Sequence, residues 1–510
     1  MKSVVSLKSL KTFNKRLVLD GIVVGMAGGF FSISYRYVLG YLNQLRERIL
    51  DKPQGGIILL WGVLLLMAAY GVYRLLKFEP LSSGSGIPQV QGELLGAFHM
   101  NPKRILFSKF LGGSLAGFAG LSLGREGPSI QIGASIGKIC STLMHRNPTE
   151  KRYMISAGAS AGLSAAFNAP ISGVLFVLEE MHKSVFPIIL IPTFIASVIA
   201  DFLSKNIFGL APAFAFSISM ALPLSYYFHC LLLGVFVGAI GVIFNKTLLG
   251  FQAQYKKASV HPYIKILAPF LAAGLLGYSF VFLLGGGHNL IENLISTDNT
   301  LGFLILLLVG KLIFTCFCYG SSVQGGIFLP VLVLGAISGS LYFKIFSLFG
   351  GMENTYLANF VILAMAGILT SVIRSPILSI LLVTEMTGSF QHILSLCIVS
   401  IVAYLVAESL NCKPIYESLL NPMITKKIDG EDYKERTVFE TRVNLDSPFL
   451  SKRLRDMGIP QNTLLLSIYR QEKEVLPRGD TIIQMGDVLT VMTDEGHLLE
   501  AKTFFRGEAV

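Results

Sequence analysis

The stretch GREGPSIQIGASIG, residues 124–137, places Arg125 and Glu126 between glycines, directly before Pro128 and a long apolar run. Proline is favoured in the first turn of a helix, and the preceding glycines let the backbone bend. The pattern therefore predicts a helix that begins here. Because a helix start leaves backbone N–H groups without intrahelical partners and carries a partial positive charge, two charged side chains at this position point to function.

Two other stretches share this design. SSGSGIP covers residues 82–88 and GGIFLP covers residues 325–330, and each ends in proline and leads into an apolar run. Inside a bilayer, unpaired amides are costly unless something fills them, and an anion is the natural occupant of a helix N-terminus. Three such ends favour a site for a halide, which needs hydrogen-bond donors. The alternative is that these Gly-Pro clusters only interrupt helices.

The composition indicates a helical membrane protein that crosses the bilayer many times. Of 510 residues only 14% are charged, and the mean hydropathy is +0.62, values that no soluble globular domain of this size has. The apolar runs are continuous rather than alternating, which argues against a barrel. The first run, residues 17–31, has no recognisable cleavage site and predicts a membrane helix, not a removed signal peptide. The clearest further runs are residues 57–76, 224–244, 266–284, 301–317 and 393–407.

Charge is distributed unevenly along the chain. The net charge is +11, and residues 430–510 hold 11 Lys/Arg and 14 Asp/Glu, so this segment carries 11 − 14 = −3 and the remainder +14. The cations lie mostly in loops, and five of them precede the first apolar run, which predicts a cytoplasmic N-terminus. They form no compact patch with aromatic residues, so nucleic acid is not expected as a partner. The six cysteines lie mostly in apolar runs and predict packing residues rather than a metal site.

The membrane region contains an internal repeat. Pro128 is followed by Gly, Ala and Gly at offsets 5, 6 and 9, and Pro330 is followed by the same residues at the same offsets. Pro170 and Pro376 are each followed by a glutamate nine residues later. The copies are 330 − 128 = 202 and 376 − 170 = 206 residues apart. Repeated halves of this size are typical of transporters, but the spacing does not distinguish parallel from inverted repeats.

The composition changes after Pro422. Residues 425–436 are polar and charged and read as a linker, which divides the chain into a membrane domain, 1–424, and a tail domain, 437–510. In the tail, LLLSIYR and VLTVMT predict strands, and SKRLRDMG predicts a basic helix that ends at glycine. The tail is therefore expected to be a small α+β domain.

Glutamates mark the functional candidates of the membrane domain. A carboxylate at an anion-binding helix start competes with the anion for that place. Glu126 is therefore expected to swing out when it is protonated and to let the anion pass. The alternative is that Glu126 forms a surface ion pair with Arg125. Ionisable residues at the end of an apolar run are functional candidates, which assigns Glu180 a proton role. Glu179 shares this position. The alternative for both residues is a structural one, because a helix end at the membrane interface can carry a charge at little cost in solvation free energy. Glu385, the repeat-related copy of Glu179, is expected to be structural.

These motifs together resemble the signature stretches of the CLC chloride channel and transporter family. GSGIP, GREGP and GGIFLP occur in the family's order, and KPIYESLL lies near the end of the membrane region. The resemblance covers residues 18–420. It implies a homodimer with a separate anion path in each subunit, and two inverted halves of short, tilted helices.

The resemblance also implies roles for individual residues. Ser85 and Tyr416 match the hydroxyls of the central chloride site, and Ile327 and Phe328 match the backbone amides that complete it. Glu126 matches the gating glutamate, beside outer-site backbone at Arg125 and Gly127, and Glu180 matches the inner proton glutamate of the exchangers. The family's channels usually replace that inner residue, so Glu180 favours antiport; the serine of GSGIP favours chloride. Gln89 and Gln91 stand where several bacterial relatives have acidic residues, which alters the local polar network.

The tail resembles the RCK C-terminal domain, also called TrkA-C, and PRGDTIIQMGDVL is its most specific part. Such domains typically pair and bind small ligands, and some bind cyclic di-AMP. A regulatory nucleotide between two tail domains is thus one expectation, and a passive dimerisation module is the alternative.

The resulting hypothesis is a chloride/proton antiporter, not an enzyme, in the bacterial plasma membrane with both termini cytoplasmic. It has no catalytic residues and needs no cofactor or metal; its partners are chloride, protons and the lipid bilayer. The alternatives are a passive gated chloride channel of the same fold and, from another class, a cation/proton antiporter regulated by the tail. A receptor-like protein with an inert membrane part is a third.

Overall fold

The computed structural model describes most of the chain. Its description covers residues 2–51, 55–183, 187–214, 222–297, 299–348, 353–425, 436–444, 447–470, 473–494 and 497–506. Nearly all of the predicted linker, residues 426–435, lies outside the described residues. The chain divides into two compact units, of which the first comprises residues 1–90, 101–145 and 153–419, and the second comprises residues 91–100, 146–152 and 420–510.

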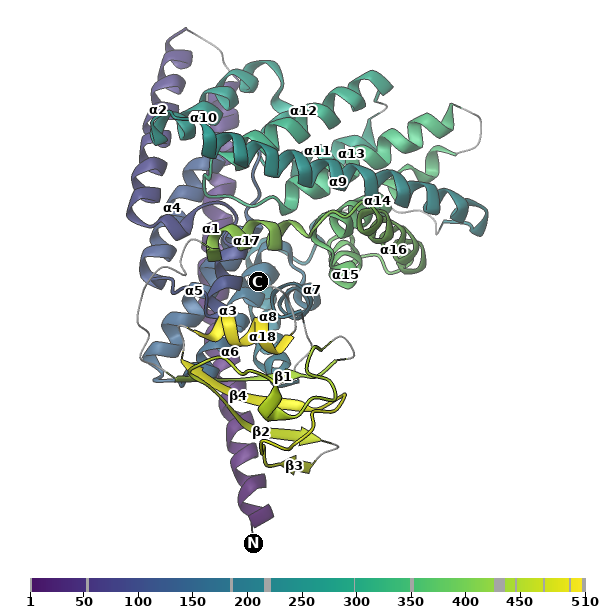
Figure 1. Ribbon diagram of the computed structural model, residues 1–510. Helices are drawn as coiled ribbons and strands as arrows, with labels where there is room; N and C mark the ends of the chain where they lie inside the picture. The colour runs from purple at the N-terminus through teal and green to yellow at the C-terminus, as the bar shows by residue number, and fades with distance from the viewer. Residues whose placement is uncertain are drawn as a thin grey trace. The chain divides into compact units, whose positions relative to one another are not determined.

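The chain before the tail is built of α-helices, which belong wholly or partly to the first unit (Figure 1). In chain order the helices up to the middle of the sequence are α1 (Lys2–Leu50), α2 (Gly55–Phe78), α3 (Ile87–Leu95), α4 (Pro102–Phe118), α5 (Glu126–Leu143), α6 (Pro148–Phe167), α7 (Pro170–Leu175), α8 (Pro187–Phe208) and α9 (Tyr227–Lys257). The later helices are α10 (Pro262–Ser279), α11 (His288–Ser296), α12 (Leu301–Gly320), α13 (Phe328–Ser347), α14 (Leu357–Ile373), α15 (Pro376–Thr387), α16 (Ile393–Ser409) and α17 (Ile415–Thr425).

Six segments of the described residues are long and apolar enough to cross a membrane: Lys15–Leu50, Gly55–Phe78, Pro187–Phe208, Leu224–Lys257, Leu301–Gly320 and Phe328–Ser347. The first apolar run lies inside α1, as predicted. The run 266–284 is not one helix, because α10 ends at Ser279 and a 3₁₀ turn, Val281–Leu283, follows. Helices α14, α15 and α16 have 12 to 17 residues and are shorter than a full span, which is the short-helix architecture expected from the sequence.

The predicted repeat is visible as two matching helix pairs. In the first half, α5 packs on α6 so closely that a Cβ atom at Gly133 would overlap the carbonyl group of Gly158. In the second half, a Cβ atom at Gly335 would lie 2.7 Å from the Cα atom of Met365 on α14. The glycines at offset 5 after Pro128 and Pro330 thus serve the same purpose, because only glycine allows this approach of two helix backbones. In Figure 1, α5 lies in the lower part of the view and α13 in the upper part.

Two glutamates join the halves reciprocally. Glu179 accepts hydrogen bonds from the backbone N–H groups of Ile377 and Leu378 (3.2 and 2.7 Å), at the start of α15. Its copy Glu385 accepts them from Ile171 and Ser172 (3.0 and 2.8 Å), at the start of α7. Each carboxylate therefore satisfies the unpaired amides of the opposite helix, which is the self-complementary contact that a two-fold relation produces.

Removing either of these two carboxylates provides a test of the repeat. Glu385→Ala and Glu179→Ala each leave two helix-terminal amides without a charged acceptor, and we expect each to lower the free energy of unfolding by about 1–3 kcal/mol. Thermal unfolding of the purified protein in detergent measures this. Glu292→Ala is the control, because Glu292 is an exposed acid on α11. Glu385 also accepts from Ser172 Oγ, so its loss should be the larger of the two. A loss of stability at only one of the two glutamates would contradict an equivalent role in the two halves.

A pair of buried lysines follows the same repeat. Lys109 Nζ donates to the carbonyl oxygens of Ser82 and Gly84 (2.9 and 2.6 Å). Lys311, which is 311 − 109 = 202 residues later, donates to those of Leu283 and Gly285 (3.0 and 2.7 Å). Each lysine thus fixes the loop that precedes a short helix, α3 or α11, and the first of these loops contains Ser85.

The tail forms a four-stranded antiparallel sheet in the order β1-β4-β2-β3, with α18 (Leu498–Arg506) against it. The strands are β1 (Arg436–Arg442), β2 (Thr463–Arg470), β3 (Lys473–Val475) and β4 (Val488–Asp494). Inward residues alternate along β4, and they pack on Leu498, Ala501 and Phe505 of the helix. The predicted strands LLLSIYR and VLTVMT are confirmed as β2 and β4, and they pair directly.

The prediction of a helix at SKRLRDMG was wrong. Only a three-residue 3₁₀ turn, Leu454–Asp456, forms there. The backbone N–H groups of Leu454 and Arg455 donate to the carbonyl oxygens of Thr481 and Gly479 (3.0 Å each), not to residues four positions earlier. Pairing with a distant segment therefore overrides the local helical preference, a competition that the sequence pattern does not reveal.

An ion pair between a buried acid and a partly exposed arginine holds the tail sheet. Asp487 is fully buried and accepts hydrogen bonds from Nε and Nη2 of Arg470 (2.8 Å each) and from the backbone of Gln484 (2.8 Å). These hydrogen bonds raise the pKa of Arg470 above its ordinary value, so the guanidinium stays charged at any pH at which the domain is folded.

We expect Asp487→Asn to destabilise the tail by about 1–3 kcal/mol, because it weakens the hydrogen bonds that a charged acceptor makes with Arg470, whose side chain is 25% exposed. Hydrogen exchange of the β2 and β4 amides in the full chain measures this as faster exchange. Asp480→Asn is the matched control: Asp480 pairs with Arg455 at 3.0 Å, but its side chain is 78% exposed. Equal exchange rates in the two variants would contradict a stabilising role for this ion pair.

Candidate functional site

The three glycine-rich stretches begin three helices, as predicted. Gly84 and Gly86, both with positive φ, lead into α3, Arg125 is the N-cap residue of α5, and Ile327 is the N-cap residue of α13. A fourth helix, α17, begins at Ile415, next to Tyr416. Each of these starts presents backbone amides without intrahelical partners.

The structure brings the three stretches together although the first and last are more than 200 residues apart. Gly124 and Gly326 exchange two backbone hydrogen bonds (2.7 Å each) in an isolated antiparallel bridge. Gly325 N donates to Gly84 O at 2.9 Å. A Cβ atom at Gly127 would lie 2.7 Å from the carbonyl oxygen of Ser85, so the starts of α3 and α5 are in direct contact.

Glu126 lies where these helix ends meet. Its side chain is fully buried, and neither carboxylate oxygen has a hydrogen-bond partner among the described residues. A Cβ atom added at Gly124 would overlap Glu126 Oε2 and would lie 3.3 Å from the Cβ atom of Leu329, in the first turn of α13. The carboxylate thus occupies the place between the N-termini of α5 and α13 that an anion would take. The alternative of a surface ion pair with Arg125 does not hold, because Glu126 is fully buried and Arg125 Nη2 donates to Ala166 O at 3.4 Å.

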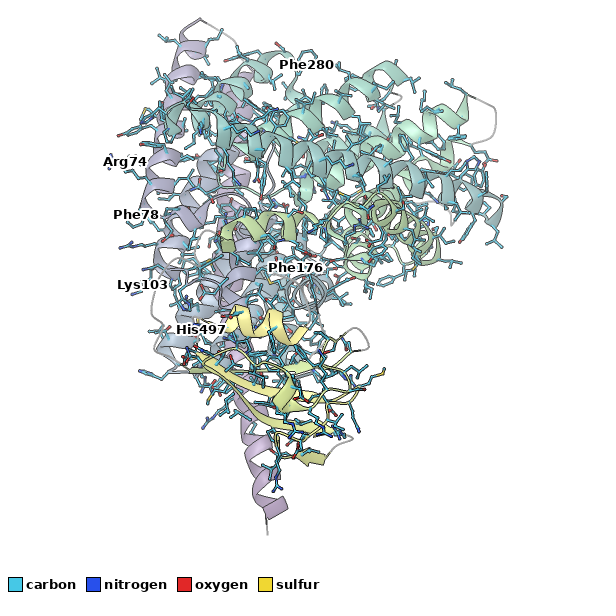
Figure 2. All side chains as sticks on the ribbon, viewed as in Figure 1. Arg74, Phe78, Lys103, Phe176, Phe280 and His497 are labelled. Carbon is cyan, nitrogen blue, oxygen red and sulfur yellow. The ribbon has the colours of Figure 1, made fainter. Side chains whose placement is uncertain are left out.

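Glu180 lies in a π-helical turn, Phe176–Met181, that continues α7. Such turns are rare and often occur at functional positions. The side chain is 3% exposed, and Ser375 Oγ donates to its Oε2 at 2.7 Å. Figure 2 shows Phe176, the first residue of this turn, in the interior of the unit, whereas Arg74 and Phe78 on α2 point outward.

Tyr416 is electrostatically linked to both acids. Its ring is completely buried, its hydroxyl has no hydrogen-bond partner among the described residues, and the charges of Glu126 and Glu180 both act on it. Tyr319 acts on it as well. The structure thereby brings the predicted residues Ser85, Gly127, Ile327 and Phe328 to one set of helix starts.

Sequence reasoning missed two hydroxyl groups at this site, those of Ser375 and Tyr319. Ser375 precedes Pro376 as the N-cap residue of α15, a position where serine is common and carries no functional signal. Tyr319 lies within the apolar run that forms α12, and its hydroxyl is the only feature there that could have indicated a site residue. Both reach the site through contacts with residues far away in the chain.

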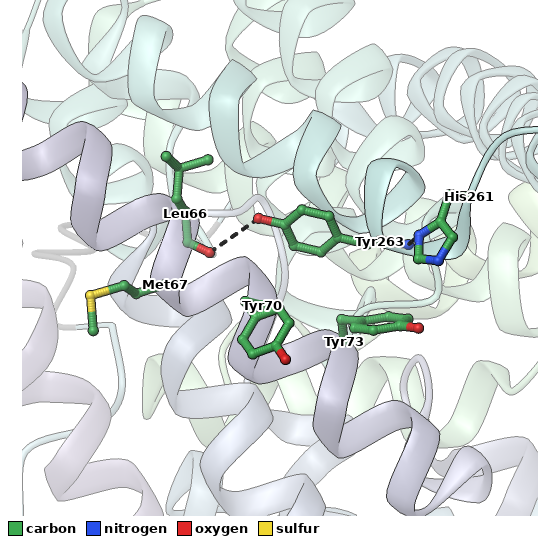
Figure 3. A pocket seen from close by; sticks show the side chains of 6 residues that line it. All are labelled: Leu66, Met67, Tyr70, Tyr73, His261 and Tyr263. Carbon is green, nitrogen blue, oxygen red and sulfur yellow. Dashed lines mark hydrogen bonds between the residues drawn. The ribbon is translucent and has the colours of Figure 1, made fainter.

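A shallow notch elsewhere on the unit contains none of these residues. It has a volume of about 390 Å³ and is lined by Leu66, Met67, Tyr70, Tyr73, His261 and Tyr263 (Figure 3). Tyr263 Oη donates to Leu66 O at 3.4 Å across it, and the aromatic rings pack edge to face or tilted. Among the described residues, no group of His, Cys, Asp and Glu has a geometry for a metal ion.

Chemically, the arrangement at Glu126 can bind a small anion. Several helix N-termini and hydroxyl donors converge in a buried region, and the nearest acid can become neutral by taking a proton. A cation would meet the positive ends of the helices, which disfavours it.

Known proteins share this architecture. The family model described as voltage gated chloride channel matches residues 64–408, and the model described as TrkA-C domain matches residues 438–506. The chain is 32% identical over 418 residues to a protein of Cronobacter sakazakii named H(+)/Cl(-) exchange transporter ClcA, covering 80% of this chain and 89% of that protein. It is 33% identical over 431 residues to the ClcA of Vibrio cholerae, covering 81% and 90%.

Solved structures agree with these matches. A slow cyanobacterial Cl⁻/H⁺ antiporter superimposes with a TM-score of 0.77 at 30% identity, covering 81% of this chain and 99% of that one. A CLC-type fluoride/proton antiporter, at 23% identity and a TM-score of 0.65, shares the fold over 79% of this chain and 97% of its own. The chain therefore belongs to the CLC, or voltage gated chloride channel, family and carries a TrkA-C domain after its membrane region.

Proposed function

We propose that this protein is a chloride/proton antiporter. The observation that carries the proposal is the buried Glu126 carboxylate between the N-termini of α5 and α13, in the place that suits an anion. The presence of Glu180 and the activity named for the relatives support proton coupling. The reaction is transport, and no covalent step is involved.

The proposed central chloride site consists of the hydroxyls of Ser85 and Tyr416 and the backbone amides of Ile327 and Phe328. The backbone at Arg125 and Gly127 forms the outer site, which the Glu126 carboxylate occupies when it is charged. These assignments draw support from the convergence of the three helix starts and from the unpartnered Tyr416 hydroxyl.

The mechanism follows from competition between chloride and the Glu126 carboxylate for the outer site. When Glu126 takes a proton it loses its attraction for the helix ends, leaves, and lets chloride occupy the outer site. When chloride leaves, the deprotonated carboxylate returns. Glu180 exchanges protons with the cytoplasm and passes them to Glu126, so that the two ions move in opposite directions.

The wider assembly is also a proposal. We infer a homodimer with one anion path in each subunit, in the bacterial plasma membrane, with both termini cytoplasmic. The transport domain is residues 1–424, the linker 425–436 and the regulatory domain 437–510. A regulatory nucleotide such as cyclic di-AMP binds between two tail domains in this scheme, and passive dimerisation through the tails is the alternative.

The test is chloride flux from proteoliposomes with pH recorded. Under a fixed chloride gradient, we expect the reversal potential to shift with the pH gradient and chloride efflux to drive proton uptake. A reversal potential that follows chloride alone would identify a passive channel, and potassium or rubidium uptake without chloride flux would identify a cation/proton antiporter. Repeating the measurement with cyclic di-AMP tests the tail: an unchanged rate supports passive dimerisation.

A further inference from the structure

Tyr319 lies against the loop that carries Ser85. It is the penultimate residue of α12, its side chain is 3% exposed, and a Cβ atom at Gly84 would lie 3.3 Å from its Oη atom. The two segments are tied by their backbones, because Gly84 N donates to Ser322 O at 3.2 Å and Gly325 N donates to Gly84 O at 2.9 Å. The Tyr319 hydroxyl therefore lies next to the loop that carries Ser85.

The hydroxyls of Tyr319 and Ser85 form one hydrogen-bonded unit. The Ser85 backbone N–H donates to Tyr319 Oη, and the two hydroxyls are hydrogen-bonded to each other. Ser85 Oγ also accepts from Ile87 N at 3.1 Å. Two hydroxyls carry two protons, and the bond between them uses one. One proton of the pair therefore remains for a further acceptor.

A second hydroxyl hydrogen without an acceptor lies nearby. The Tyr416 hydroxyl is buried without a hydrogen-bond partner among the described residues, and Tyr319 lies close enough that the two groups would repel each other if both lost their protons. Buried hydroxyls without acceptors are costly, so an acceptor is needed between them. The helix starts nearby provide only more donors, which leaves an anion as the fitting occupant.

We propose that Tyr319 is a further ligand of the central anion site, where its hydroxyl joins those of Ser85 and Tyr416, and that it adds selectivity for chloride over larger anions. The inference rests on the proposed function, since it assumes that the central site binds chloride. A third hydroxyl favours a small anion with concentrated charge, because such an anion forms the stronger hydrogen bonds. Thiocyanate, which is large and accepts weaker bonds, gains less from it.

Tyr319→Phe tests this, because it removes only the oxygen and keeps the ring. We expect chloride to bind about tenfold more weakly in calorimetric titrations of the full-length protein, as the loss of a hydrogen bond to a charged group predicts. Thiocyanate binding should change less than twofold, so the chloride-to-thiocyanate preference falls. Equal chloride affinity in variant and wild type overturns the proposal.

Tyr342→Phe is the matched control. Tyr342 is another buried tyrosine, and its hydroxyl bonds with His229 near the far end of α13, so its loss should leave chloride affinity unchanged. A double variant separates direct contact from positioning of Ser85. If Tyr319 contacts the anion, Ser85→Ala with Tyr319→Phe binds more weakly than Ser85→Ala alone; equal affinities overturn a ligand role.

A measurement on the wild type avoids dependence on a folded variant. In crystals soaked in bromide, we expect an anomalous peak within hydrogen-bond distance of Tyr319 Oη, and a central peak out of reach of that atom overturns the inference. The failure of the proposed function looks different, because then the wild type itself shows neither chloride binding nor a central bromide peak.

Discussion

Replacing Glu126 with glutamine is expected to abolish proton movement while chloride still crosses the membrane. The amide has nearly the shape of the carboxyl group but cannot take up or release a proton. It is also neutral, so it no longer competes with chloride for the positive ends of α5 and α13. The outer site then becomes available to the anion at every pH.

The measurement is paired recording of chloride efflux and external pH from proteoliposomes. For Glu126→Gln, proton uptake should fall to that of protein-free liposomes, and the reversal potential should equal the chloride equilibrium potential at every pH gradient. Glu292→Gln is the control, because Glu292 is an exposed acid on α11 and should leave coupling intact. Continued proton pumping by Glu126→Gln would refute the role assigned to this residue.

Glu180→Gln is expected to produce the second large effect, a loss of proton transport with chloride flux retained. Glu180, which we propose as the inner proton acceptor, is held by Ser375 and buried in the π-helical turn, and glutamine cannot carry a proton there. Unlike Glu126, it lies at no helix start, so its neutralisation opens no anion site. In Glu180→Gln the rate of chloride transport should therefore stay at the wild-type level. In Glu126→Gln the pH dependence of chloride transport should change as well.

The neighbouring acid gives an internal comparison. Glu179 precedes Glu180 directly but caps α15, so Glu179→Gln should lower thermal stability and keep proton coupling. Ser375→Ala should slow proton transport only partly, because it removes the donor that positions the acid and leaves the acid itself. The assignment fails if Glu180→Gln still couples protons to chloride as the wild type does.

Much of the local design was predictable from the sequence. Glycines before a proline fix where α3, α5 and α13 begin, because backbone freedom followed by a restrained φ is a property of those residues alone. The matching offsets after Pro128 and Pro330 predicted the repeat, since equal helix packing demands small residues at equal positions. Long uncharged runs predicted the membrane region, because whether a segment can lie in lipid depends mainly on its own composition.

The tertiary structure decided what depends on contacts between distant segments. The reciprocal capping by Glu179 and Glu385 joins residues about 200 positions apart, and nothing local to either glutamate indicates its partner. The predicted helix at SKRLRDMG failed because Leu454 and Arg455 bond to residues 481 and 479 instead. Tyr319 and Ser375 became site residues only once folding placed their hydroxyls beside Ser85 and Glu180. Backbone preferences act over a few residues and can be read along the chain, whereas a binding site is a meeting of side chains in space, and only the folded chain fixes which of them meet.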